Sequence, residues 1–247
     1  MTRPLKMERA NCPICGIPSQ TEVARGKDFE YHSSEQEVSF KLCLNCGVYY
    51  LDPRPAISEL GRLYERDYEP YHFDRLPQIV RWARKQTLKQ KISLLKTFAE
   101  KNAVIVDIGC GSGEFLKEIG QHNGHLWNLI GNDISEDAML NLKANGFAVI
   151  PGRFEQSTLP PNSTDVAMML QVIEHLDNPN KVVQMAFKVL KPGGRLLIET
   201  PSFDGLDARL FRKRYWGGYH FPRHWTIFNK NSLSRLLETN GFHIIQT

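Results

Sequence analysis

Short apolar runs alternate with amphipathic segments through the last two thirds of this 247-residue chain. The runs are rich in β-branched residues and bounded by turn residues, which predicts buried parallel strands, and the segments between them have helical spacing. We expect strands over residues 104–106, 127–132, 147–150, 166–172 and 195–200, and helices starting at 114 and spanning 136–145 and 181–190. This alternation predicts an α/β fold with a doubly wound, mostly parallel sheet.

The first 55 residues have a different pattern, with short strand-like pieces near 37–42 and 48–51. Two C-x-x-C pairs, each followed by glycine, are separated by 27 residues; the four cysteines are Cys12, Cys15, Cys43 and Cys46. In a reducing compartment such pairs indicate a zinc site rather than disulfides, and four thiolates leave no open position on the ion. We therefore expect a zinc-ribbon-like module with a structural zinc; four free cysteines in a small β module are the alternative.

Residues 56–100 are expected to form a helical connector. An aromatic stretch from Tyr64 to Phe73 would cover a ligand as a lid or pack between modules. The following helix, 77–100, has an apolar face that begins at Ile79 and Trp82 and an opposite face rich in Arg and Lys. That basic face would bind phosphates or remain solvated.

The strand at 104–106 continues directly into a turn with three spaced glycines, Gly109, Gly111 and Gly113. Glycine lets backbone approach a ligand closely. A dinucleotide site needs a third glycine where this chain has Glu114, whose carboxylate would repel phosphate. Asp107, just before the turn, also favours a ligand with a cationic end.

At these residues the chain resembles motif I of the class I S-adenosylmethionine-dependent methyltransferases. Two later stretches resemble signatures of the same family, Glu174-His-Leu-Asp-Asn-Pro179 and Leu190-Lys-Pro-Gly-Gly194. Asp133 follows Gly113 by 20 residues, where a doubly wound fold places the carboxylate that binds both ribose hydroxyls. The resemblance covers residues 76–247 and implies a Rossmann-like methyltransferase domain over 101–247. The family's sheet has seven strands. With a sixth over 243–246, either the last strand would be lacking from this sequence or the edge of the sheet would be completed otherwise.

The resemblance also implies a set of residues that bind the cofactor. Arg153 stands where the family commonly has Asp, so Glu155 is expected to take over the adenine contact, and Phe154 to stack on the ring. The expected cofactor-binding residues are Asp107, Gly109, Cys110, Gly111, Gly113, Asp133, Ile134, Phe154, Glu155 and Gln171.

Methyl transfer to a hydroxyl or an acidic carbon also needs a base. His175 follows the fourth strand, at the sheet edge where α/β ligands bind, and is the first candidate, with Glu174 as its neighbour. His220 is the second candidate. The alternative for Glu174 and His175 is structural: one orders the turn and the other packs.

Composition and charge bear on where the protein acts and on which class of acceptor it methylates. The chain is 41% apolar with a net charge of +4, and no segment has the length and hydropathy of a signal core or membrane span. We therefore expect a cytoplasmic S-adenosylmethionine-dependent methyltransferase acting at oxygen or carbon of a small sugar, lipid or natural-product-like acceptor. The alternative is an RNA methyltransferase that binds nucleic acid through the zinc module, the basic helix and the basic aromatic segment 209–225. A non-catalytic cofactor-binding regulator is a third hypothesis.

Overall fold

The structure is a computed structural model that describes residues 3–19, 21–64, 77–123, 126–211 and 216–246. The chain divides into two compact units. Unit 1 comprises 1–65, 171–183 and 199–247, and unit 2 comprises 66–170 and 184–198. The units thus interleave along the chain, whereas the predicted division at residues 55 and 100 runs in consecutive segments. That residues 1–55, 56–100 and 101–247 form separate domains stays a prediction.

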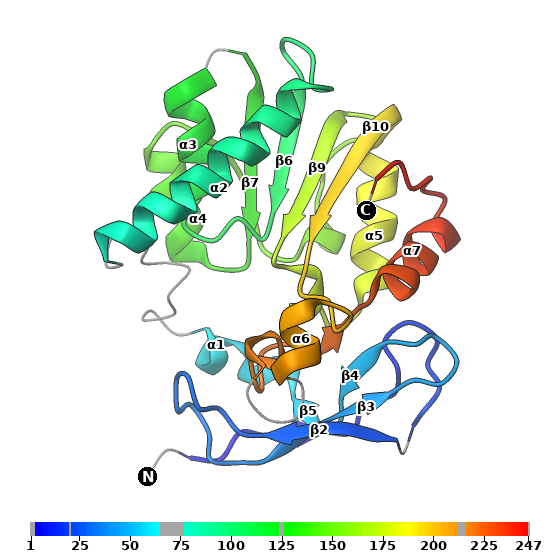
Figure 1. Ribbon diagram of the computed structural model, residues 1–247. Coiled ribbons are helices and arrows are strands. Elements are labelled where there is room, and N and C mark those ends of the chain that lie inside the picture. Colours follow the sequence, from blue (N-terminus) through cyan, green and yellow to red (C-terminus); the bar gives the residue numbers. More distant parts are fainter. Residues whose placement is uncertain (1–2, 20, 65–76, 124–125, 212–215, 247) are drawn as a thin grey trace. The chain divides into compact units, whose positions relative to one another are not determined.

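Unit 2 contains a five-stranded sheet, which confirms the predicted α/β class (Figure 1). Its strand order is β10-β9-β6-β7-β8, and the pairings of β6 with β7, β6 with β9 and β7 with β8 are parallel. The order reverses between β6 and β9, and α/β sheets bind ligands beside such a reversal. The strands are β6 (Val104–Ile108), β7 (Asn128–Asp133), β8 (Ala148–Pro151), β9 (Thr164–Leu170) and β10 (Leu190–Glu199).

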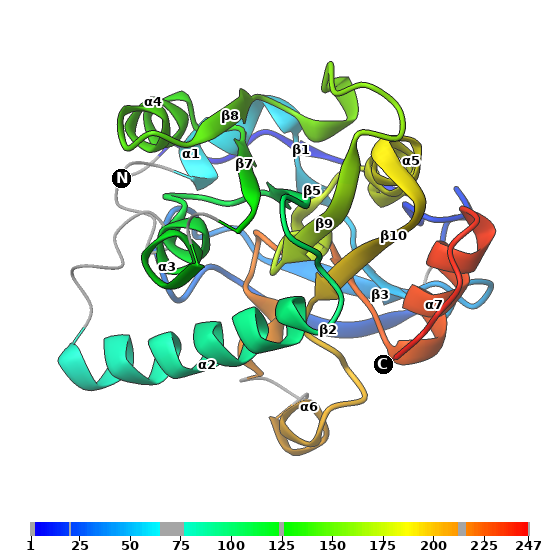
Figure 2. The same cartoon turned by 90° about the horizontal axis from the view of Figure 1, so that it is seen from above.

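Helices flank this sheet on both faces (Figure 2). They are α2 (Gln78–Lys96), α3 (Glu114–Asn123), α4 (Glu136–Ala144) and α5 (Pro179–Val189), with the 3-10 turn η4 (Phe154–Gln156) after β8. One apolar cluster joins α2 and α3 to β6 and β9, and a second joins α3 to α4. Ser135 caps α4, because its hydroxyl accepts the backbone N–H of Ala138 at 3.2 Å.

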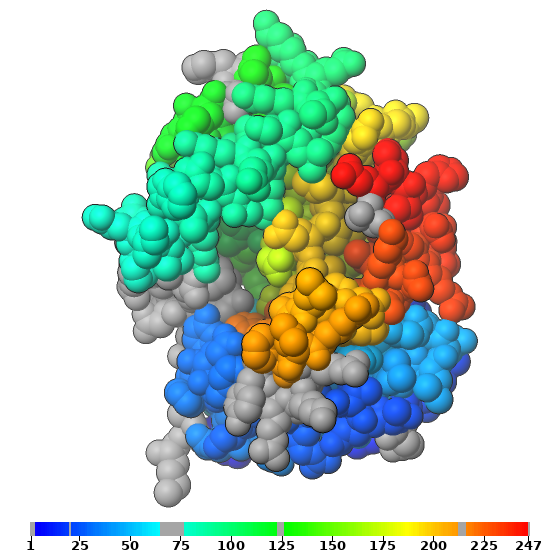
Figure 3. Space-filling view, viewed as in Figure 1, coloured from blue at the N-terminus to red at the C-terminus, as the bar shows by residue number. Residues whose placement is uncertain are grey.

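The amphipathic prediction for α2 holds only for its second half. Ile92 and Leu95 are buried, whereas Ile79 and Trp82 are 71% and 61% exposed. The helix lies across the surface of the molecule (Figure 3, teal). Helical spacing alone therefore overestimated the length of the packed face, since spacing does not show how far the neighbouring elements extend.

Unit 1 is built on a four-stranded antiparallel sheet of order β11-β4-β3-β2. β2 (Glu22–Gly26), β3 (Val38–Leu42) and β4 (Tyr49–Leu51) come from the N-terminal module, but β11 (Thr226–Ile227) comes from near the other end of the sequence. Thr226 pairs with Tyr50 and Ile227 with Tyr49. The core of this unit is largely aromatic and includes Phe40, Trp216, Tyr219, Phe221 and Trp225.

The remaining elements of unit 1 are short. β1 (Met7–Glu8) pairs with β5 (Arg54–Pro55) in a small antiparallel ladder, in which Met7 is opposite Pro55. The helical pieces are η1 (Ile57–Glu59), α1 (Leu60–Leu63), η5 (Ile173–His175), α6 (Leu206–Phe211), η6 (Gly217–Tyr219) and α7 (Lys230–Thr239).

The end of the chain has less regular structure than expected. The prediction of a sixth strand over 243–246 was wrong, because residues 242–246 form no strand. The turn at 191–194 was expected between helix and strand, but it is included in β10. The proposed aromatic lid falls mainly on residues 65–76, outside the described residues. In the part of the chain that the structure describes, no helix combines the length and apolar character needed to cross a membrane.

Candidate functional site

The turn after β6 holds three glycines in a conformation that other residues rarely adopt. Gly109, Gly111 and Gly113 have φ angles of 69°, 53° and 74°. A Cβ on Gly113 would lie 2.4 Å from Cδ1 of Leu142, so packing against α4 also requires glycine there. The predicted strand, turn and helix are confirmed, and the turn leaves backbone exposed to a ligand rather than side chains.

Asp133, the last residue of β7, is tied to this turn. Its Oδ2 accepts the N–H of Gly111 at 2.9 Å, and its Oδ1 accepts the N–H of Ser135 at 2.9 Å. The neighbouring Asn132 donates through Nδ2 to the carbonyls of Ile150 and Gly152. These contacts hold the carboxyl ends of β6, β7 and β8 together, at the edge where α/β folds bind ligands.

Asp107 lies near the carboxyl end of β6 and is 4% exposed. Burial and the neighbouring charge of Asp133 raise the pKa of the Asp107 carboxyl from 3.8 to about 7, and Lys91 opposes the shift only in part. Two buried carboxylates with one weakly opposing cation form an electronegative site. Such a site suits a ligand that brings positive charge.

The structure places the other predicted cofactor residues in different surroundings. Ile134 is 46% exposed directly after Asp133, whereas Phe154 is 3% exposed. The carboxylate of Glu155 accepts from Arg153 Nε at 2.6 Å. The Cys110 thiol packs with the apolar cluster between α3 and α4, and burial raises its pKa well above the ordinary value. At Cys110 only the backbone is therefore suited to contact a ligand.

Gln171 follows β9 and belongs to unit 1. Its φ angle of 58° is unusual for a residue with a side chain. The backbone N–H donates to the carbonyl of Glu199 at 2.8 Å, and the side-chain amide donates to the Glu199 carboxylate at 3.2 Å. The side chain thus already has a protein partner.

Glu174 and His175 lie in η5, and their surroundings are polar. Glu174 is completely buried; its Oε2 accepts the Thr200 hydroxyl at 2.9 Å, and among the described residues its Oε1 has no hydrogen-bond partner. Burial raises the pKa of Glu174 to about 8 and lowers that of His175 to about 3. His175 Nδ1 lies 2.9 Å from the Tyr64 hydroxyl and 3.1 Å from the Arg223 carbonyl.

Two more histidines surround His175. Its ring meets those of His224 and His220 edge-on, with centroids 4.5 and 6.2 Å apart. His220 Nδ1 lies 2.8 Å from the carboxylate of Glu30, and His224 Nδ1 lies 2.8 Å from the carbonyl of Gly218. The two predicted base candidates, His175 and His220, are therefore brought together in unit 1.

From the sequence, Tyr64 was expected only as the start of an aromatic stretch that would cover a ligand or pack between modules, and Glu30 and His224 had no individual role. The contacts of Tyr64 and Glu30 could not be predicted, because their partners, His175 and His220, are more than 100 residues away. His224 lies in the basic aromatic segment 209–225, which was expected as a contact for RNA. Burial and proximity to His175 lower the pKa of His224 well below the ordinary value.

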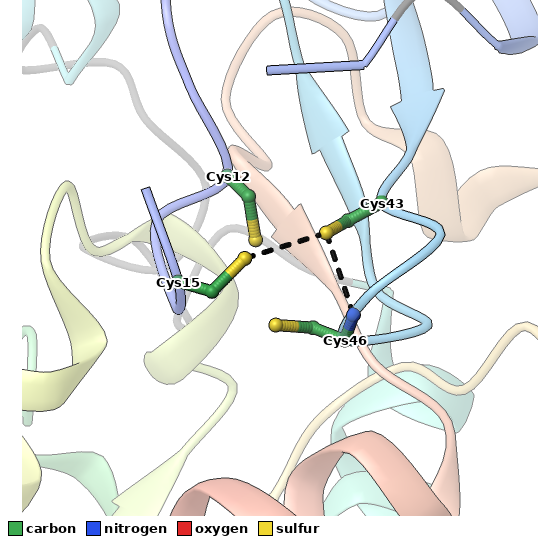
Figure 4. A group of neighbouring side chains, drawn as sticks. All are labelled: Cys12, Cys15, Cys43 and Cys46. Carbon is green, nitrogen blue, oxygen red and sulfur yellow. Dashed lines mark hydrogen bonds between the residues drawn. The ribbon is translucent and has the colours of Figure 1, made fainter. Parts of the chain in front are cut away.

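The four paired cysteines converge in unit 1 (Figure 4). Their sulfurs all lie within 4.8 Å of one another, and Cys15 Sγ is 3.6 Å from Cys43 Sγ. Tetrahedral Zn–S bonds of about 2.3 Å place sulfurs about 3.8 Å apart. Both pairs form the same knuckle, because Gly16 and Gly47 have φ angles of 74° and 71° and donate to the carbonyls of Cys12 and Cys43. This donor set could hold a zinc ion.

Comparison with known proteins identifies the family. The model of a family described as "methyltransferase domain" matches residues 80–247. The chain belongs to this family. The matched segment therefore includes the strands of the unit 2 sheet. It also includes His175, His220 and His224 of unit 1, which we call the histidine cluster.

Individual relatives agree with the assignment. The chain is 30% identical over 152 residues to a protein of Mycolicibacterium smegmatis named "Probable S-adenosylmethionine-dependent methyltransferase", covering 58% of this chain and 53% of that one. It is 27% identical over 143 residues to a ubiquinone biosynthesis O-methyltransferase of Pseudomonas fluorescens, covering 55% of each. The matched segment thus spans about half the length of these relatives. The PH0226 protein of Pyrococcus horikoshii shares the fold, with a TM-score of 0.55, 20% identity and coverage of 74% and 90%.

Proposed function

We propose that the protein transfers the methyl group of S-adenosylmethionine to oxygen or carbon of a small-molecule acceptor. The observation that carries this function is the pair of buried carboxylates, Asp107 and Asp133, at the carboxyl ends of two adjacent parallel strands. S-adenosylmethionine combines a sulfonium and an ammonium with a ribose, and its methyl group is activated for displacement by the sulfonium. The site's charge fits this combination better than it fits a pyrophosphate.

The residues of the turn would each have a separate task. The positive φ angles at Gly109 and Gly111 let backbone pass close to the cofactor, and the apolar Ile134 would pack against it. Asp133 would accept hydroxyl protons of the ribose while its oxygens keep their backbone donors. Asp107 would face the cationic end, because Lys91 offsets the effect of its burial only in part.

The acceptor side is assigned to the histidine cluster of unit 1. His175 remains the first candidate base. Its contact with the Arg223 carbonyl is favourable only when Nδ1 carries the proton, which leaves the Nε2 lone pair to accept one. His220, paired with Glu30 through Nδ1, is the second candidate, and Glu174 is the acidic neighbour. His175, or His220 in its place, would take the proton of a hydroxyl or an acidic carbon.

A small acceptor is favoured over RNA. The M. smegmatis and P. fluorescens relatives bear the names of S-adenosylmethionine-dependent and ubiquinone-biosynthesis methyltransferases, and the net charge of this chain is only +4. The RNA alternative is supported by one observation, the exposed Trp82 among the basic residues of α2. Stacking and phosphate contacts of that kind weaken steeply with salt.

We assign a structural zinc ion to Cys12, Cys15, Cys43 and Cys46. The support is the convergence of the four sulfurs and the matching geometry of the two knuckles. Four thiolates complete the coordination of zinc, so the ion would stabilise unit 1 rather than take part in catalysis.

The test of the proposed function is transfer of labelled methyl groups from S-adenosylmethionine to cell extracts separated into RNA, lipid and soluble metabolites. We expect label in the lipid or metabolite fraction, with little change between 50 and 300 mM salt. Label in RNA that falls steeply with salt would favour the alternative. Absence of transfer, together with calorimetry showing no S-adenosylmethionine binding, would contradict the proposal.

A further inference from the structure

The histidine cluster has a feature that a base does not require. One donor atom from each of Glu174, His175 and His224 lies within 4.8 Å of the others. A cation with ligands at about 2.1 Å has opposite donors about 4.2 Å apart, so small side-chain movements would bring all three into one coordination sphere. These three residues belong to unit 1.

Hydrogen bonds orient both rings as metal ligands. His224 Nδ1 lies 2.8 Å from the Gly218 carbonyl, and His175 Nδ1 lies 3.1 Å from the Arg223 carbonyl. A carbonyl only accepts, so both contacts assign the proton to Nδ1 and the lone pair to Nε2. The Tyr64 hydroxyl, 2.9 Å from His175 Nδ1, then accepts from the same N–H. Metal-binding histidines have the same arrangement, in which one nitrogen binds the ion and the other donates to a fixed oxygen.

The carboxylate of Glu174 provides an independent observation. The residue is completely buried, and within the described structure its Oε1 lacks any hydrogen-bond partner. Leaving a buried polar atom unpaired costs about 1–3 kcal/mol, more if it is charged. A cation would satisfy this oxygen while the Thr200 hydroxyl retains the other.

Nearby charges act on a cation in both directions. The positive charge of Arg223 is felt at His175 and His224, where it lowers the pKa, but Asp28 pairs with the Arg223 guanidinium at 3.0 Å and offsets part of that charge. The carboxylate of Glu199 lies close enough to Glu174 to repel its charge. His220 is held through Nδ1 by Glu30, which leaves Glu174, His175 and His224 as the three ligands.

We infer that Glu174, His175 and His224 form a binding site for a divalent transition-metal cation. Two imidazoles and one carboxylate are a donor set for such ions, and three protein ligands leave positions open for other ligands. An acceptor oxygen could occupy an open position, which would favour methylation at oxygen; this last point rests on the proposed function. With the ion bound, His175 would act as a ligand, and the proton-accepting role would pass to His220.

Manganese binding tests the inference without any methyl donor. The probe is Mn²⁺ added to purified protein that carries one zinc ion per chain, enough for the four cysteines only, and followed by the electron paramagnetic resonance signal of the free ion; thiolate sites select zinc over manganese. We expect one Mn²⁺ per chain and a loss of affinity of roughly tenfold or more in Glu174→Gln. The matched control is Glu118→Gln, which removes a carboxylate that is also buried and also contacts a histidine, His122. That variant should bind as the wild type does.

A second measurement covers the case in which Glu174→Gln does not fold. In the wild type, Mn²⁺ should broaden the ring resonances of His175 and His224 at substoichiometric amounts, before those of His122. Absence of Mn²⁺ binding, or binding that leaves these two rings unaffected, would overturn the inference. Either result would leave the proposed function standing, since S-adenosylmethionine affinity is measured separately.

Discussion

The guanidinium of Arg223 donates to the carboxylate of Asp28 over 3.0 Å, and both side chains are almost completely buried. The same guanidinium donates through Nε to the carbonyl of Leu63 and lies over the ring of Tyr31, 4.2 Å from its centroid. Burial alone would raise the pKa of Asp28, but hydrogen bonds from Ser33 and Tyr31 and the charge of Arg223 lower it. The pair thus anchors the segment that carries His220 and His224 to the N-terminal module.

Removing one partner of this pair should be costly. Arg223→Met leaves Asp28 charged and buried, and we expect the free energy of unfolding to fall by about 3–5 kcal/mol. Urea denaturation would measure the loss. The double variant Asp28→Asn with Arg223→Met should recover part of it, and Glu22→Gln, which breaks the exposed pair with Arg25, should cost less than about 1 kcal/mol. Equal losses for the buried and exposed pairs would contradict this account.

Asp133 should be required for cofactor binding through its charge as well as its geometry. Asp133→Asn keeps one oxygen that can accept the N–H of Gly111 or Ser135, whereas Asp133→Ala keeps neither. We expect calorimetry to show weaker S-adenosylmethionine binding in Asp133→Asn and none in Asp133→Ala. Unchanged affinity in Asp133→Ala would remove the assignment of this carboxylate to the ribose.

Cofactor affinity should depend on pH through Asp107. Its pKa of about 7 means that binding a cationic group below pH 7 first requires loss of a proton. We expect S-adenosylmethionine to bind about tenfold more weakly at pH 6 than at pH 8, with proton release detectable by calorimetry in two buffers. Asp107→Asn should bind S-adenosylmethionine weakly at every pH. Its affinity should no longer change with the titration of residue 107, and only the titration of the ligand itself should remain.

The same residue should lower the stability of the ligand-free protein. A carboxyl whose pKa is raised on folding contributes stability below pH 3.8, and this contribution is lost as pH rises through 7. Asp107→Asn should therefore increase the free energy of unfolding at pH 8, by at most about 4 kcal/mol. If Asp107→Asn increased the free energy of unfolding equally at pH 8 and pH 4, the gain would not result from the charge of Asp107.

Replacement of His175 should affect turnover more than cofactor binding. We expect His175→Gln to lower the rate of methyl transfer by about 10²- to 10⁴-fold while S-adenosylmethionine affinity stays near the wild-type value. Tyr64→Phe removes only the hydroxyl beside His175 Nδ1 and should have a smaller effect. A parallel loss of turnover, cofactor affinity and thermal stability in His175→Gln would indicate a structural role.

The cysteine site should hold one zinc ion per chain. Chelation or Cys46→Ser should lower the free energy of unfolding by roughly 5 kcal/mol or more, because ligand binding there is coupled to folding of unit 1. Cys110→Ser is the matched control, since this cysteine lies in unit 2 outside the cluster. Elemental analysis showing no zinc in protein purified without chelator would contradict the assignment.

Local patterns along the chain were sufficient to predict the five parallel strands, the glycine turn and the convergence of the cysteine pairs. Each of these depends on residues that are near in sequence or on an apolar run long enough to require burial. The class of the sheet followed from the alternation of strands and helices. By contrast, the exposed half of α2 and the missing strand over 243–246 show that spacing does not report which neighbours cover an element.

The tertiary structure decided how the two units interleave and where the histidine cluster forms. β11 has only two residues and therefore no periodicity to detect, yet it pairs with β4 and brings the preceding segment to the N-terminal module. Asp28 with Arg223, and Tyr64 with His175, are contacts between residues more than 100 positions apart. The sequence shows which residue types are present in these pairs. It does not show that the partners lie close together, because their proximity results from the packing of a core whose parts come from both ends of the chain.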